Sequence, residues 1–112
     1  LIQALVHCSG GAQTKCLKFG TNIHFIKDGL FPTPAIFNAI QRVSDTAWKE
    51  MYKVFNMGHR MEVYCLPEMV ETVIAAAATF NIDARVVGRT EAAEDGNRLS
   101  LHHGTEIFSY RM

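Results

Sequence analysis

The sequence lacks long apolar runs and runs of one charge. No stretch of its 112 residues approaches the roughly 20 apolar residues of a membrane-spanning helix, and no secretory signal pattern is present. Acidic and basic residues balance at 11 each, so nothing in the composition points to nucleic acid or to an anionic membrane. We therefore expect a cytoplasmic domain that binds neither.

Cysteine is also scarce. The three cysteines, Cys8, Cys16 and Cys65, are odd in number and lack Cys-x-x-Cys spacing. This pattern argues for a reducing compartment and against both a disulfide framework and a zinc site. The histidines are scattered, and the adjacent pair His102-His103 would point to opposite faces of a strand. We expect no metal site from these residues.

Nucleotide-binding motifs are missing as well. The chain has no Walker lysine loop, no Gly-x-Gly-x-x-Gly fingerprint and no cluster of carboxylates suited to Mg²⁺. If a nucleotide takes part in its chemistry, the ligands of the accompanying metal must lie elsewhere.

What the chain does have is a glycine turn between an apolar run and a possible helix. The stretch from Leu5 to Thr14 passes through His7 and then Ser9-Gly10-Gly11. The Ser9 hydroxyl and the two glycine amides suit an anionic group, and His7 could contact a phosphate or act as an acid or base. A turn that binds nothing, preceded by a histidine satisfied at a strand end, fits the same residues.

Apolar periodicity predicts strands mixed with helices. Strands are expected at 2–7, 59–66 and 84–89, an extended segment at 21–27, helices at 34–43, 48–55 and 67–80, and an ambiguous segment at 13–19. The tail 91–112 is expected to form a hairpin or two short strands, with the turn residues of a hairpin at Asp95-Gly96-Asn97 and a break at Gly104. This order predicts an α+β fold with a mixed, mostly antiparallel sheet and helices packed on it.

The same patterns predict which side chains are buried. The strand 2–7 is expected to be buried, and the strand 59–66 should place Met61, Val63 and Cys65 on the core and Arg60, Glu62 and Tyr64 outside. An aromatic stripe on the helix 48–55 could stack bases, but core packing is the better interpretation. The helix residues expected to be mostly buried are Trp48, Met51, Phe55, Val70, Val73, Ile74 and Phe80.

The first residues bear on domain organisation. The chain begins inside an apparent strand without an initiator methionine. Because termini are usually loose and polar, we expect a fragment of a longer polypeptide whose active site is split.

Three segments resemble one enzyme family in the family's own order. Val6–Ala12 is similar to the His-x-Thr-Gly-Gly-Gly loop of phosphoribosylformylglycinamidine cyclo-ligases, also called aminoimidazole ribonucleotide synthetases. Leu30–Phe37 resembles their proline pair before an Ile-Phe helix, and Glu50–Gly58 resembles their Glu-Met-x-x-x-Phe-Asn-Met-Gly signature. The resemblance covers about residues 4–90.

The resemblance implies that residues 1–112 are the single carboxy-terminal domain of a two-domain, homodimeric enzyme. The amino-terminal domain, absent here, would bind most of the ATP and Mg²⁺. The activity implied is ATP-dependent closure of the imidazole ring of aminoimidazole ribonucleotide from formylglycinamidine ribonucleotide. The substrate-binding residues implied are His7, Ser9, Gly10, Gly11, Asn56 and Gly58, and the isolated domain should be inactive.

The chain departs from the family pattern at three places. Ser9 replaces threonine, Ala12 stands where a third glycine is usual, and His59-Arg60 replaces small residues. Ala12 should make a helix start easier than a strained loop. A sister domain also remains open: one like selenophosphate synthetase, thiamine-monophosphate kinase or the formylglycinamidine ribonucleotide amidotransferase. A non-catalytic ligand-binding module is a further alternative.

Overall fold

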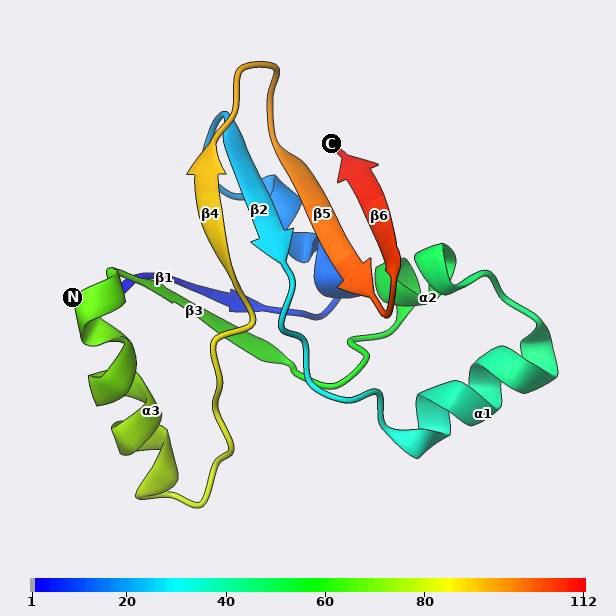
Figure 1. Cartoon of the computed structure of the whole chain (residues 1–112), viewed down its shortest axis with the longest axis horizontal. Coiled ribbons are helices and arrows are strands. Elements are labelled where there is room, and N and C mark those ends of the chain that lie inside the picture. Colours follow the sequence, from blue (N-terminus) through cyan, green and yellow to red (C-terminus); the bar gives the residue numbers. More distant parts are fainter. Residues whose placement is uncertain (1) are drawn as a thin grey trace.

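The computed structural model, which describes residues 2–112, confirms the α+β class (Figure 1). Its strands are β1 (Ile2–His7), β2 (Ile23–Lys27), β3 (Met61–Cys65), β4 (Gly88–Ala92), β5 (Arg98–His103) and β6 (Glu106–Arg111). Its helices are α1 (Ala35–Ser44), α2 (Trp48–Val54) and α3 (Val70–Ala78), with 3₁₀ segments η1 (Ala12–Lys18) and η2 (Pro67–Met69). None of the described helices is long and apolar enough to cross a membrane.

The strands form two sheets. β1 and β3 pair antiparallel as a two-stranded ribbon, and the other four strands are ordered β4-β2-β5-β6. In the larger sheet β2 is antiparallel to β4 and parallel to β5, while β5 and β6 form a hairpin. The mixed, mostly antiparallel pairing agrees with the prediction.

The predicted hairpin at Asp95-Gly96-Asn97 is wrong. β4 and β5 lie on opposite sides of β2, so the segment between them crosses the end of β2 (Figure 1). The buried Asn97 side chain fixes this crossing, because it accepts from the Ile23 amide at 2.9 Å and donates to the Leu17 carbonyl at 2.9 Å. The hairpin turn lies instead at Gly104, whose φ is +60°.

The strand predicted at 84–89 is displaced to Gly88–Ala92. β2 ends at Lys27, opposite Gly88, so residues 84–87 have no strand beside them to pair with. At Gly88 the two backbones approach so closely that a Cβ would collide with the Ile26 carbonyl. Close backbone approach is a reason for glycine in a strand.

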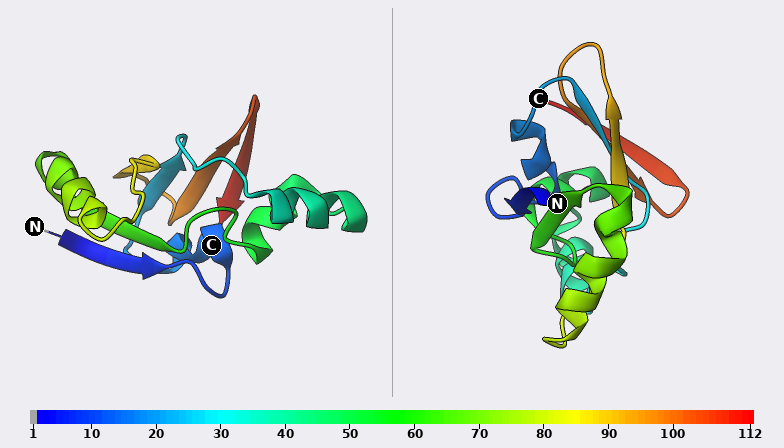
Figure 2. Two further views of the ribbon diagram at one scale, coloured as in Figure 1. Left: turned by 90° about the horizontal axis from the view of Figure 1, so that it is seen from below. Right: turned by 90° about the vertical axis from the view of Figure 1, so that its left-hand side faces the viewer.

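The main core lies between the four-stranded sheet and the pair η1 and α2 (Figure 2). Its buried residues are Cys16, Leu17, Phe25, Met51, Tyr52, Met57, Leu99, Leu101 and Tyr110. The aromatic stripe of α2 is core rather than a stacking surface: Trp48 stacks on His103 at 4.6 Å, and the Tyr52 hydroxyl contacts His103 Nδ1 at 2.8 Å.

Burial outside the main core is less complete, and it is lower than predicted at Phe80 and in β1. No residue of α1 or α3 is fully buried, and Figure 1 shows these helices at opposite ends of the molecule. Of the seven helix residues expected to be mostly buried, only Met51 is fully so, and Phe80 is 76% exposed because it lies beyond the end of α3. Trp48, Phe55, Val70, Val73 and Ile74 are partly buried, with most of their surface covered, so Phe80 alone contradicts the prediction. β1 is mostly exposed because it has a partner strand on one side only.

This distribution predicts unequal effects of truncation. Met51→Ala should lower the free energy of unfolding by about 2–5 kcal/mol, because it leaves a cavity in a closed core. Phe80→Ala should change it by less than about 0.5 kcal/mol, since most of that ring is already in water. Urea unfolding of both variants measures the difference, and equal losses would contradict the placement of the core.

Candidate functional site

A buried lysine lies beneath the predicted loop. Lys27 ends β2, and its side chain is 4% exposed. Its ammonium group donates to the Gln13 carbonyl at 2.9 Å, to Gln13 Oε1 at 2.8 Å and to Glu62 Oε2 at 2.6 Å. These three acceptors match the three hydrogens of an ammonium group.

The prediction of which face of β3 points to the core is wrong, because Glu62, the partner of Lys27, lies on the buried face. Glu62, expected outside, is buried, whereas Met61 and Val63 are exposed by 54% and 37%. The physical reason is Lys27: an unpaired buried charge is costly, so β3 turns its carboxylate inward to meet the ammonium group. Because side chains alternate along a strand, the apolar neighbours then face out.

Further donors surround this carboxylate. His59 Nε2 lies 2.6 Å from Glu62 Oε2, and the Tyr64 hydroxyl donates to Oε1 at 2.7 Å. Burial alone would raise the pKa of Glu62, but the His59 hydrogen bond, the charge and hydrogen bond of Lys27 and the Tyr64 hydrogen bond outweigh burial and lower that pKa to about 2. Glu62 is therefore ionised at neutral pH.

The glycine loop connects β1 to η1 through left-handed backbone. Gly11 has φ +94° and Ala12 φ +48°, so Ala12 begins η1 in a conformation that costs a residue with a Cβ about 1–2 kcal/mol. The methyl group of Ala12 is buried, and its amide donates to the Ser9 carbonyl at 2.7 Å. The alanine thus begins a helical segment, as expected, but in a left-handed conformation that strains it.

A second turn lies next to this loop. Asn56 Oδ1 accepts from the Gly58 amide at 3.0 Å, and Met57, with φ +61°, anchors the turn through its buried side chain. Two hydrogen bonds join turn and loop: Gln13 Nε2 donates to the Asn56 carbonyl at 2.6 Å, and the Cys8 amide donates to the Arg60 carbonyl at 2.7 Å.

The structure thus places the six residues predicted to bind substrate on two linked segments. His7, Ser9 and Gly10 are exposed and Gly11 is half-buried on the loop. Asn56 is half-buried and Gly58 is exposed on the turn. Their roles remain predictions. The sequence analysis did not predict the network of Lys27 and Glu62. The signal for it was one charged residue within each of two largely apolar strands, Lys27 in β2 and Glu62 in β3.

A cavity of about 690 Å³ lies on the other side of the network, between β3, α3 and residues 82–90. Lys27, His59 and Glu62 line one end, and the half-buried stripe of α3 supplies apolar wall. Its volume is in the range of small-molecule sites. Of the six predicted binding residues only Gly58 lines it.

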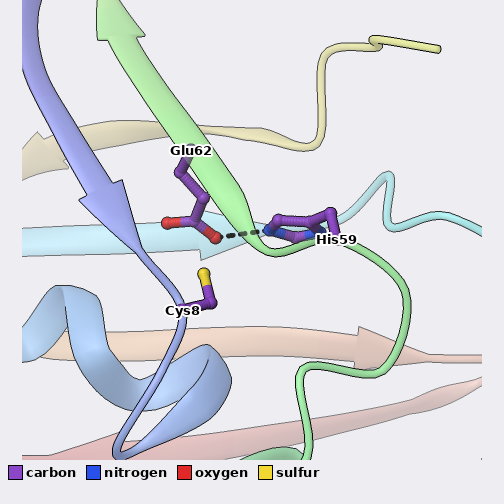
Figure 3. Close-up of side chains that lie close together, drawn as sticks. All are labelled: Cys8, His59 and Glu62. Carbon is purple, nitrogen blue, oxygen red and sulfur yellow. Dashed lines mark hydrogen bonds and ion pairs between the residues drawn. The ribbon is translucent and has the colours of Figure 1, made fainter. Parts of the chain in front are cut away.

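Three possible metal ligands also meet in this network. Ligand atoms of Cys8, His59 and Glu62 lie within 4.8 Å of one another, and Figure 3 shows the thiol and the imidazole on the same side of the carboxylate. The Lys27 ammonium group, however, already holds Glu62 Oε2. Burial, reinforced by the charge of Glu62, raises the pKa of Cys8 to about 12, so the thiol is protonated in the arrangement described here. In this arrangement the cation beside Glu62 is the ammonium group of Lys27.

Comparison with known proteins identifies similar chains. Phosphoribosylformylglycinamidine cyclo-ligases of Methanococcus vannielii and Methanocaldococcus jannaschii are 32% and 33% identical to this chain over 80% and 79% of its length. The Brevibacillus brevis cyclo-ligase is 30% identical over 94%. The chain spans only 25% to 30% of the length of these relatives. No family model matches it. The resemblance to this enzyme family is confirmed.

The lowered pKa of Glu62 predicts a pH dependence of stability. A carboxylate with a lowered pKa in the folded state stabilises the fold above its unfolded pKa of 4.5, and that contribution disappears as the pH falls toward 2. Glu62→Gln combined with Lys27→Met, which leaves no buried charge unpaired, should remove a slope of up to about 1.4 kcal/mol per pH unit in this window. Unfolding in urea between pH 5 and pH 2 measures it.

Glu50→Gln is the matched control, because the Glu50 side chain is half-exposed and 3.8 Å from Lys53. It should keep the wild-type slope. A double variant, Glu62→Gln with Lys27→Met, that shows the same slope as the wild type would contradict the ionised, bonded state of Glu62.

Proposed function

From its similarity to the phosphoribosylformylglycinamidine cyclo-ligases, we propose that this chain is the carboxy-terminal domain of such an enzyme. The complete enzyme would be a cytoplasmic homodimer that closes the imidazole ring of aminoimidazole ribonucleotide from formylglycinamidine ribonucleotide with ATP. The observation that carries the proposal is identity of 30% to 33% over 79% to 94% of the chain.

The loop would contribute contacts to an anionic group of the substrate. Within residues 2–112 the amides of Gly10 and Gly11 donate no hydrogen bond, and the Ser9 hydroxyl makes only a long contact of 3.5 Å to the His7 carbonyl. These donors, with the exposed His7, are available to a phosphate. Asn56 and Gly58 would shape the opposite wall, because the turn is bonded to η1 and to the end of β1.

ATP would supply the phosphoryl group that activates the formyl oxygen for attack by the amidine nitrogen. The described residues do not fit a magnesium site. Their one grouping of three metal-ligating side chains contains a single carboxylate, held by Lys27, whereas Mg²⁺ prefers several oxygen ligands. ATP and Mg²⁺ are therefore assigned mainly to the amino-terminal domain, and the role of residues 1–112 is to bind and orient the substrate.

Complementation tests the activity directly. The gene for the complete polypeptide should restore growth without purines to a bacterial strain that lacks its cyclo-ligase, and the 112-residue chain alone should not. A complete protein that is folded but fails to support growth would contradict the proposed function.

If the glycine loop contacts the substrate, a side chain added at Gly11 should weaken substrate binding. Gly11→Val in the complete enzyme should raise the KM for formylglycinamidine ribonucleotide about tenfold to hundredfold, as expected for one lost charge-assisted hydrogen bond. A Cβ at Gly11 would meet only ordinary contacts at 3.6 Å, so its strain comes from φ +94°.

Gly96→Val provides the control. Gly96 has nearly the same φ, +86°, with nothing within 4 Å of a Cβ, and it lies in the crossing before β5. Both variants should lower the melting temperature by similar amounts, and only Gly11→Val should change KM. Wild-type kinetics in Gly11→Val would remove the loop from the site.

A further inference from the structure

The burial of both charges of the Lys27–Glu62 pair is not explained by a gain in stability. Both side chains are 4% exposed. Burying two charges costs several kcal/mol per ion, and replacing such a pair by uncharged side chains of similar volume is often neutral or stabilising. Because stability does not account for this pair, we consider a role in fixing the positions of the segments around it. Its hydrogen bonds indicate which segments these are.

One side of the pair controls Gln13. Lys27 binds both the carbonyl and Oε1 of Gln13, and this sets the side-chain amide so that Nε2 points to the Asn56 carbonyl, 2.6 Å away. Gln13 is 1% exposed, so no water competes for these bonds. The orientation of one buried amide thus links the first turn of η1, directly after the glycine loop, to the Asn56 turn.

The other side of the pair controls His59. Glu62 Oε2 holds His59 Nε2 at 2.6 Å, directly after Gly58. The Cys8 amide, at the start of the glycine loop, bonds the Arg60 carbonyl. Both segments that carry the predicted substrate contacts are therefore fixed to a single pair of charges. Lys27 is itself held in β2, between β4 and β5 of the four-stranded sheet.

We propose that Lys27 and Glu62 are positioning residues that set the distance between the glycine loop and the Asn56–Gly58 turn. They act through Gln13 and His59, without touching the substrate. The inference rests on the proposed function for its effect on catalysis. Its structural part, that the pair holds the two segments together, stands on the hydrogen bonds alone.

The test uses the complete enzyme with Lys27→Met and Glu62→Gln combined. Removing one partner alone would leave a buried unpaired charge and could unfold the protein, whereas the double variant is uncharged and of similar volume. It should stay folded while the KM for formylglycinamidine ribonucleotide rises about tenfold or more, because the two walls of the site are no longer held in register. Glu50→Gln with Lys53→Met makes the same exchange at an exposed pair and should leave KM unchanged.

Gln13→Met separates positioning from general loss of structure. It removes the amide link while leaving Lys27 and Glu62 paired, so it should reproduce the rise in KM. Adding it to the double variant should raise KM little further, because all three changes break one chain of contacts. A purely structural role predicts a lower melting temperature with normal KM in the folded fraction, and that result would overturn the proposal.

Hydrogen exchange gives a readout that does not depend on activity. In the double variant, peptides covering residues 8–14 and 55–60 should exchange at least several-fold faster, while those covering β5 and β6 stay unchanged. Unchanged exchange in both segments would overturn the inference whatever the enzyme does. If the two segments exchange faster in the double variant but the wild-type enzyme lacks cyclo-ligase activity, only the proposed function is contradicted.

Discussion

The ion pair between Lys27 and Glu62 is the constraint on which the rest of the arrangement depends. A buried ammonium group requires a nearby anion and three acceptors, and the fold supplies them from η1 and β3. That requirement decides which face of β3 is inward. It also brings together a loop near the start of the chain and a turn near its middle. The main apolar core, centred on Met51 and Leu99, lies beside this network and fixes the sheet from which Lys27 extends.

Local features of the fold could be predicted because their causes are local. A helix that begins directly after Pro34, a strand after Gly58 and a 3.6-residue stripe on α2 each depend on neighbours along the chain. The position of the glycine loop is of the same kind. The predicted helix 48–55 and strand 59–66 also leave residues 56–58 as the connection between them, and there Met57 and Gly58 have positive φ.

The remaining features depend on partners that are distant in sequence. Alternation in β3 gives two faces, but which one is buried depends on the charge of Lys27, which periodicity does not register. The Asp95-Gly96-Asn97 turn has the residues of a hairpin, yet it makes a crossing because β2 already lies between the strands that it joins. The apolar stripe of α3 is mostly covered, as predicted, but none of its residues is fully buried, because the stripe faces a cavity.

The place of β2 in the larger sheet has a consequence for how the chain is made. β2 is complete when residue 27 has been synthesised, but its two neighbours begin at residues 88 and 98. Until those residues have been synthesised, both edges of this apolar strand lack the partners that satisfy them, and pairing must close loops of about sixty and seventy residues. An apolar strand that is made so long before its partners exposes unpaired edges to other nascent chains, and collapse onto η1 and α2 is a way to shield it in the meantime.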